Sequence, residues 1–275
     1  MRIDAHQHFW QYQPETHGWI SDEMSILRKD FMPEELKTAL ADFSFDGSVA
    51  VQADETYAEN EFLLEIAQKN DYIKGIVGWV DLLDPQAEVK MIALKSTPAI
   101  VGFRTIMQGS PDEKYLGNKL FLDNVKRLAT FDYTFDLLVH NNQLDSLIRF
   151  TDNLPDNRFM LDHLGKPSIK YKEYKTWKTQ IKVLAANPNI YCKLSGMTTE
   201  ADLKNWTYND LFPYMEIAAE YFGLDRICFG SDWPVCLAAG SFATTYSVVD
   251  QFCVQLKQEE KDKIFGLNTK EFYKL

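Results

Sequence analysis

Short runs of apolar residues alternate with longer amphipathic stretches along almost the whole chain. The short runs predict strands, and the longer stretches predict helices with one apolar face. The predicted strands are 1–8, 46–52, 73–80, 99–105, 133–140, 158–164, 189–196 and 226–232. Predicted helices include 56–70, 86–96, 118–130, 142–153, 171–186 and 208–222, and another begins at Pro33. Eight strands alternating with helices indicate an α/β protein with a closed parallel (β/α)8 barrel, the TIM barrel.

The length of the chain agrees with this fold. A (β/α)8 barrel typically takes about 250 residues, and this chain has 275. No glycine-rich phosphate loop follows the first predicted strand, which argues against a dinucleotide-binding fold. Neither an internal repeat nor a linker-like segment divides the chain, so we expect residues 1–275 to form one domain. The long segment 10–32 follows the first strand, where functional loops are common.

Composition and charge exclude some classes of protein. Hydrophobic residues make up 45% of the chain, which is enough for a large core, and the net charge of -11 argues against a nucleic-acid partner. No apolar run is long enough to span a membrane, and no signal-peptide pattern precedes the first strand, so we expect a soluble cytoplasmic protein. The four cysteines form no metal-binding spacing, and we expect reduced thiols. The oligomeric state stays open, a homo-oligomer included.

Most of the unusual polar residues lie at the C-terminal ends of the predicted strands. They are His6 and His8 on the first strand, then Gln52, Arg104, His140, His163 and Asp232 on the second, fourth, fifth, sixth and eighth. In a parallel barrel these ends open onto one face, where the loops build the active site. Four of the five histidines of the chain are in this set. The pattern therefore predicts one functional site.

Each of these residues also has a structural explanation. His6 and His8, two positions apart, point to the same side of a strand and could simply be satisfied by hydrogen bonds. His140 could be a core histidine, and His163 could cap the turn that follows its strand. Asp232 could cap the next segment, and Arg104 could pair with a neighbouring acid. It is the shared position of the whole set that favours function.

The residue types narrow the chemistry. An aspartate beside histidines can act as the base that activates water. Histidines can ligate a divalent ion or stabilise an oxyanion, and an arginine suits an oxygen-rich or anionic substrate. No serine or cysteine lies in a nucleophile elbow, so attack by water is favoured over a covalent intermediate.

These residues resemble the amidohydrolase superfamily, and several phrases resemble its sugar-lactonase branch, the fuconolactonase- and rhamnonolactonase-like proteins of the amidohydrolase 2 family. The phrases are Ile3-Asp4-Ala5-His6-Gln7-His8-Phe9-Trp10, Gly102-Phe103-Arg104, Asp162-His163-Leu164-Gly165-Lys166-Pro167, Lys193-Leu194-Ser195-Gly196, Phe229-Gly230-Ser231-Asp232-Trp233-Pro234-Val235 and Asn268-Thr269-Lys270-Glu271-Phe272-Tyr273. They run from one end of the chain to the other.

The resemblance implies a hydrolase that opens the ring of a sugar-derived lactone with activated water. Asp232 would be the base, and His163 and His140 would be further catalytic residues. His6, His8, His163 and Asp232 would hold one divalent ion, zinc first, and whether turnover needs the ion stays open. Substrate contacts would come from Arg104, Gln52, Trp79 and Trp233.

The sequence departs from the wider superfamily at one point, and three other functions stay open. Binuclear members bridge two metals with a carboxylated lysine or a glutamate from strand 4 or 5, and Arg104 and His140 stand at those ends here, which argues against a binuclear centre. The alternatives are a metal-dependent decarboxylase of a small aromatic or unsaturated acid, a pyrone dicarboxylate hydrolase and a non-catalytic carbohydrate-binding barrel. The second would need several arginines in the site, and the third would not need a water-activating aspartate.

Overall fold

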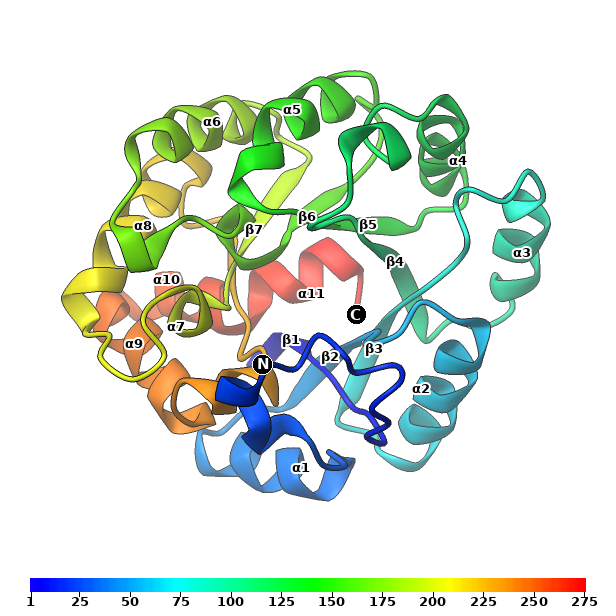
Figure 1. Ribbon diagram of the computed structural model, residues 1–275. Helices are drawn as coiled ribbons and strands as arrows, with labels where there is room; N and C mark the ends of the chain where they lie inside the picture. The colour runs from blue at the N-terminus through cyan, green and yellow to red at the C-terminus, as the bar shows by residue number, and fades with distance from the viewer.

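The computed structural model describes residues 1–275 and forms a (β/α)8 barrel, as predicted (Figure 1). Eight parallel strands pair with their sequence neighbours in order, and the helices surround them. The strands are β1 (Ile3–Gln7), β2 (Gly47–Val51), β3 (Ile73–Gly78), β4 (Ile100–Ile106), β5 (Thr134–Leu138), β6 (Phe159–Leu161), β7 (Ile190–Leu194) and β8 (Ile227–Phe229). Each lies within a residue or two of its predicted range at its N-terminal end.

Helices follow the strands at the predicted places. They are α1 (Pro33–Asp42), α2 (Tyr57–Lys69), α3 (Ala87–Leu94), α4 (Lys119–Thr130), α5 (Leu144–Asp152), α6 (Lys175–Ala185), α7 (Met197–Glu200) and α8 (Tyr208–Phe222), then α9 (Phe242–Phe252), α10 (Gln258–Asp262) and α11 (Asn268–Tyr273). Side-chain caps fix several starts: Thr56 accepts a hydrogen bond at α2, and Asn118 does so at α4. The sequence analysis did not predict α7 or the three helices after α8.

The last helix packs against the inside of the barrel. Phe272 and Tyr273 of α11 join a cluster of buried residues that face the barrel interior: Ile3, Ala5, Val49, Val51, Val77, Met160 and Cys228. In Figure 1 α11 lies across the centre of the ring of strands. The Tyr273 hydroxyl donates to Asp136 of β5 at 2.7 Å. The chain end therefore closes the interior behind the strand ends that carry the predicted site.

The ring of strands has one irregular seam, between β8 and β1. Every other neighbouring pair forms a parallel ladder, whereas β8 and β1 do not. Beyond the end of β8 the chain reaches β1 through two backbone bonds, from Asp232 N–H to the His6 carbonyl at 2.9 Å and from His8 N–H to the Trp233 carbonyl at 2.7 Å. Asp4 adds side-chain bonds, accepting from the Ser231 N–H at 2.8 Å and from the Ser231 hydroxyl at 2.5 Å. The seam is therefore closed largely by residues outside a ladder.

Two further observations bear on the sequence analysis. No helix combines the length and apolar character needed to cross a bilayer. Cys192, Cys228, Cys236 and Cys253 are all buried with free thiols.

Candidate active site

Left-handed backbone conformation places two of the predicted residues. Strands β6 and β8 were expected to run through Leu164 and Asp232, but they end at Leu161 and Phe229. The chain leaves the strand direction because His163 has a φ of 51° and Asp232 a φ of 55°. Such angles are costly for residues with a Cβ and persist where the surroundings impose them, often at functional sites. These turns carry both side chains over the end of the barrel.

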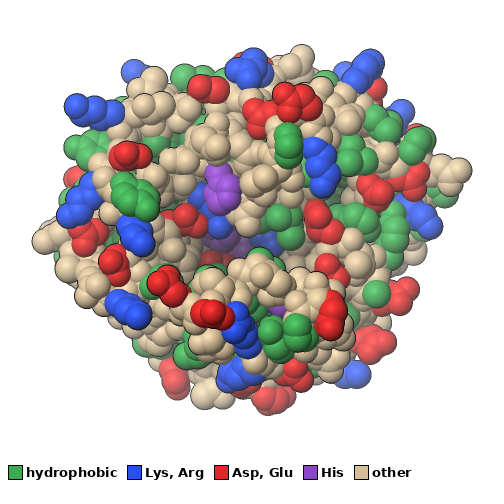
Figure 2. Space-filling model, viewed as in Figure 1, with side chains coloured by type: hydrophobic (Ala, Val, Ile, Leu, Met, Phe, Trp, Pro, Cys, Tyr) green, Lys and Arg blue, Asp and Glu red, His purple; other side chains and the backbone are tan.

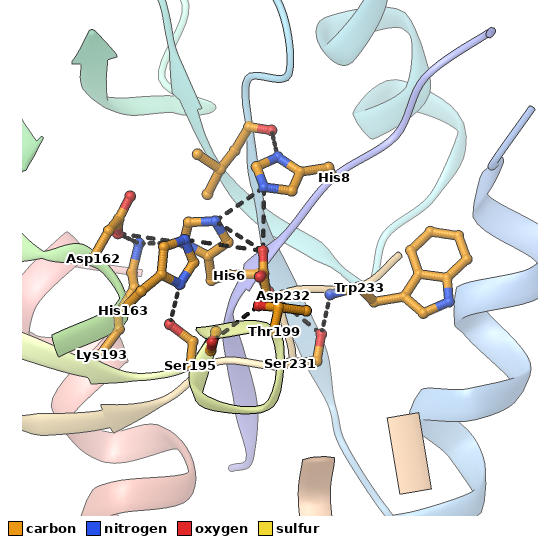
Figure 3. Close-up of polar contacts among 12 residues, drawn as sticks. His6, His8, Asp162, His163, Lys193, Ser195, Thr199, Ser231, Asp232 and Trp233 are labelled. Atoms are coloured by element: carbon orange, nitrogen blue, oxygen red, sulfur yellow. Dashed lines mark hydrogen bonds and ion pairs between the residues drawn. The ribbon is translucent and has the colours of Figure 1, made fainter. Parts of the chain in front are cut away.

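Three imidazoles converge on one oxygen of Asp232 (Figure 3). From Asp232 Oδ1, the distances to the Nε2 atoms are 3.6 Å for His8, 3.8 Å for His6 and 4.0 Å for His163. The Nε2 atoms of His6 and His8 are themselves 3.0 Å apart. All four side chains are buried or nearly so. The structure thus brings together His6, His8, His163 and Asp232, from the ends of β1, β6 and β8.

The opposite ring nitrogen of each histidine has its own partner. His8 Nδ1 lies 2.7 Å from the Val51 carbonyl; a carbonyl only accepts, so Nδ1 carries the hydrogen and Nε2 keeps its lone pair. His163 Nδ1 lies 2.8 Å from the Ser195 hydroxyl. Partners of this kind fix the ring orientation and tautomer of metal-binding histidines.

His6 is oriented by a buried group of charges beneath it. Its Nδ1 lies 3.3 Å from Asp162 Oδ1 and 3.1 Å from Lys193 Nζ. Lys193 in turn pairs with Asp136 at 2.5 Å and with Asp162 at 2.9 Å. A hydrogen on Nδ1 would be donated to Asp162 Oδ1 and leave the Nε2 lone pair facing Asp232, whereas an Nδ1 without a hydrogen would accept from the Lys193 ammonium.

The protonation states suit a site that binds cations or activates water. Burial lowers the pKa of His6, His8 and His163, the last to about 4, so the imidazoles are neutral at pH 7. Burial alone would raise the pKa of Asp232, but the three surrounding histidines outweigh it and hold that pKa well below its usual value. Burial opposes charge on Lys193 as well, yet its two aspartates raise its pKa. Asp232 is therefore anionic, and Lys193 stays protonated.

The donor set fits a single divalent ion. Tetrahedral zinc with ligands at about 2.0–2.2 Å would place neighbouring ligand atoms roughly 3.3–3.6 Å apart. Four separations among these atoms, 3.0, 3.6, 3.8 and 4.0 Å, bracket that spacing. Two imidazole nitrogens as close as those of His6 and His8 must share a hydrogen or a cation. His6, His8, His163 and Asp232 could hold the ion. The ligand atoms of His6, His8 and Asp232 all lie within 4.8 Å of one another, and so do those of His6, Asp162 and His163.

A cavity of about 270 Å³ opens above the cluster. His8, His163, Asp232 and Arg104 contribute to its lining near the cluster, and Figure 2 shows the hollow in the centre of this face, with histidine and charged side chains within and beside it. One wall is apolar, made by Trp10, Trp19 and Met24 of the loop after β1 and by Val235 after β8. The other wall includes Gln108, Lys166, Thr199 and Glu200.

Arg104 is the one predicted substrate contact that lines this cavity. Its guanidinium is also tied down, because Nη1 donates to Asp162 at 3.1 Å and Nη2 donates to the Gln52 carbonyl at 2.6 Å. The alternative explanation of Arg104, pairing with an acid, thus holds together with its place on the cavity wall.

Gln52, Trp79 and Trp233 lie outside the cavity, contrary to the prediction that they contact substrate. Gln52 is fully buried and donates to the Arg104 carbonyl, so it positions that residue. The backbone of Trp79 is bound by the Asn60 side chain, and its ring packs on Tyr57. The ring of Trp233 points away from the cluster in Figure 3 and packs between Phe9 and Phe31.

His140 does not join the cluster either. It follows β5 as predicted, but it is only half-buried and makes no ion pair with Asp232. Its neighbours are the charges of Lys166 and Glu200; burial and Lys166 lower its pKa. Its place is therefore beside the charged wall of the cavity, outside the group of donors around Asp232.

Sequence reasoning missed the charged residues below and beside the cluster. Asp136, Asp162 and Lys193 lie within the predicted apolar strands, where a charge without a visible partner is a signal that could have been followed. Asp162 and Lys193 stood inside the phrases that carried the family resemblance, but we assigned them no role. Glu200 had no signal, since the one-turn helix that presents it was not predicted.

Known proteins resemble this chain over its whole length. The family described as Amidohydrolase matches residues 3–275. Two curated relatives named L-fucono-1,5-lactonase, from Burkholderia ambifaria and Burkholderia multivorans, are 32% and 34% identical to this chain. Each alignment covers 100% of this chain and 96% of the relative.

A solved structure gives the same picture. An amidohydrolase from Burkholderia multivorans, crystallised with bound zinc, superimposes with a TM-score of 0.96 and 33% identity. The match covers 100% of this chain and 99% of that one. The bound zinc is a property of that protein.

Proposed function

The chain belongs to the amidohydrolase family, and on that premise we propose that it is a sugar lactonase, a hydrolase of carboxylic ester bonds that opens the ring of an aldonolactone. The observation that carries the proposal is the convergence of three neutral histidines on the anionic Asp232 at the base of the cavity. The names of the relatives support it and make L-fucono-1,5-lactone the first substrate to test.

Asp232 acts as the base in this proposal. Water held near Oδ1 gives its proton to the carboxylate as its oxygen adds to the lactone carbonyl. The bond from the carbonyl carbon to the ring oxygen then breaks, and the proton passes to that ring oxygen. The product is an open-chain hydroxy acid. A carboxylate is a weak base for ordinary water, so Asp232 needs a water that is easily deprotonated.

A divalent ion held by His6, His8, His163 and Asp232 would supply that condition, since bound zinc lowers the pKa of water to about 7 and polarises a carbonyl. The chain contributes the remaining steps. Arg104 presents a fixed positive charge to the cavity, where charge develops on the carbonyl oxygen. Trp10 and Met24 exclude bulk water from one side.

The size of the cavity supports a small substrate. Its volume of about 270 Å³ lies just below the roughly 300–1,000 Å³ typical of ligand pockets. A single-ring lactone is of the right class. A small-molecule partner also agrees with the negative net charge, while the cytoplasmic location and the oligomeric state stay predictions.

The experiment is a screen of aldonolactones by acid release, beginning with L-fucono-1,5-lactone. We expect turnover that falls after chelation and returns with zinc; turnover that survives chelation would show the metal to be dispensable without removing the lactonase. A parallel assay for carbon dioxide from small aromatic acids tests the decarboxylase alternative. Acid release from none of the lactones, by zinc-loaded protein, would contradict the proposed function.

A further inference from the structure

Two successive loops supply the charged wall of the cavity, and a third loop lies beside it. Lys166 follows β6, Glu200 ends the single turn of α7 after β7, and half-buried His140 follows β5. Lys166 and Glu200 line the cavity and form an ion pair at 3.0 Å. Their side chains are only 17% and 24% exposed. The pair is therefore partly desolvated and faces the space above Asp232.

Local backbone geometry holds Lys166 in this position. Four consecutive residues, 163–166, have φ between 48° and 68°. Within this left-handed turn the Lys166 N–H donates to the His163 carbonyl at 2.8 Å, and the Trp177 indole donates to the Leu164 carbonyl at 2.8 Å. The same turn therefore places His163 in the cluster and Lys166 on the charged wall, and it fixes the positions of the two side chains relative to one another.

The pair has hydrogen-bonding capacity to spare. A lysine ammonium has three donors and a carboxylate has about four acceptor sites, and each side chain here has only the other as its ion-pair partner. The cavity thus combines this charged pair with apolar side chains, which are Trp10, Trp19, Met24, Val235, Ala53, Ile106 and Leu138. A lactone ring that carries hydroxyl groups has the same character: apolar C–H faces and a polar edge away from the carbonyl.

We propose that Lys166 and Glu200 are specificity-determining residues that bind hydroxyl groups of the substrate, Lys166 by donating and Glu200 by accepting hydrogen bonds. This inference rests on the proposed lactonase function and deepens it. It selects polyhydroxylated lactones over plain ring lactones, because an unsubstituted ring offers nothing to the spare donors of Lys166 and the spare acceptors of Glu200 and displaces the water that would otherwise bind them.

The test compares two substrates in wild type and variants. L-Fucono-1,5-lactone carries ring hydroxyl groups, and δ-valerolactone carries none. For Lys166→Met and Glu200→Gln we expect kcat/KM on the hydroxylated lactone to fall about 10- to 100-fold, mainly through KM, as is typical of lost hydrogen bonds to charged groups. The value for δ-valerolactone should stay within about twofold of wild type. If the two residues had only a structural role, kcat/KM would fall for both substrates together.

The matched control is Lys172→Met. Lys172 is also a left-handed lysine, with φ of 56°, and it also pairs with a carboxylate, Asp210, at 2.9 Å. It is 75% exposed and lies away from the cavity, so we expect unchanged kinetics on both lactones.

The outcomes separate the two proposals. A zinc-loaded wild type that hydrolyses neither lactone would overturn the proposed function. An active wild type whose Lys166→Met and Glu200→Gln variants keep their preference for the hydroxylated lactone would overturn this inference alone. If Lys166→Met does not fold, Glu200→Gln decides, since it keeps the size of the side chain and removes only its charge.

Discussion

Two seams on different sides of the barrel are built in different ways. Between β4 and β5, five consecutive residue pairs run from Gly102 opposite Thr134 to Ile106 opposite Leu138 without a shift. Between β8 and β1 there is no ladder, and Asp4 and Ser231 make side-chain bonds across the gap. His6, His8 and Asp232 all lie on the irregular seam. β8 ends at Phe229, and beside this seam Asp232 turns toward the histidines.

This contrast indicates a division of work between the seams. A ladder holds two strands at a fixed spacing with backbone groups alone, which suits stability. At the β8–β1 seam, two backbone hydrogen bonds and the side-chain bonds of Asp4 together set how far apart the strand ends lie, and the spacing of the donor atoms depends on them. Damage to the two seams should therefore have different consequences.

The largest expected effect is at the irregular seam itself. Asp232→Asn keeps the size of the side chain but removes its basicity, so turnover should fall about 10²- to 10⁴-fold while substrate binding is largely kept. If Asp232 were only a cap, the change would cost about 1 kcal/mol of stability and leave normal turnover in the folded fraction. Melting temperature and turnover measured on one preparation distinguish these outcomes.

Asp210→Asn is the control for that measurement. Asp210 accepts hydrogen bonds from the Thr207 N–H and hydroxyl at the start of α8, so it is a cap with no place in the cavity. The Asp210→Asn variant should be less stable than the parent protein but should keep its turnover. A folded Asp232→Asn protein with near-parental turnover would show that the base has been wrongly assigned.

A smaller effect is expected from the side-chain bonds that close the seam. Asp4→Ala removes the acceptor for both His6 N–H and Ser231 N–H, so the histidines and Asp232 should separate. Misplacement of reacting groups by about 1 Å can cost 10²-fold, and we expect a loss of about that size in kcat. The control is Thr134→Val on the regular seam, where the hydroxyl donates to the Val101 carbonyl. Equal specific activity in the two variants would contradict the division of work.

The smallest effect compares the same substitution in both seams. A methyl group at Gly230 would lie 2.9 Å from His6 Cβ, and one at Gly102 would meet the Thr134 hydroxyl and carbonyl. Each should cost about 1–3 kcal/mol by overpacking. Only Gly230→Ala should also reduce the activity per folded molecule, by about tenfold or less, because the added methyl group displaces His6. Urea unfolding and active-site titration of both variants measure the difference. A Gly102→Ala protein with the same loss of specific activity would remove the contrast.

The repeating architecture could be predicted because strands and helices differ in the spacing of their apolar residues, and that spacing is visible in the sequence. The starts of the strands were placed well, whereas the ends of β6 and β8 were placed too late. At His163 and Asp232 a left-handed turn, imposed by tertiary contacts, overrides a sequence that still reads as extended. The helices after α8 were missed because that stretch follows the last strand and lies outside the repeating pattern that we used.

The site could be predicted in part for the same reason. The convergence of His6, His8, His163 and Asp232 could be predicted because strand ends in a barrel meet at one face, while their roles stay predictions. Gln52 and Trp233 share those ends but point elsewhere, and direction depends on packing that sequence position does not reveal. Lys166 and Glu200 come from loops, whose shape depends on the whole fold.

The route of the chain across the seam has a consequence for biosynthesis. Asp4 and Ser231, which tie the two sides of the site together, are 227 residues apart. His6 and His8 therefore leave the ribosome long before Asp232 exists, and the barrel interior is sealed only when Tyr273 reaches Asp136. At an elongation rate of about 5–20 residues per second, this interval lasts on the order of ten seconds or more. The nascent chain carries its histidines through that time without their carboxylate, so the site is completed only after most of the barrel has been synthesised.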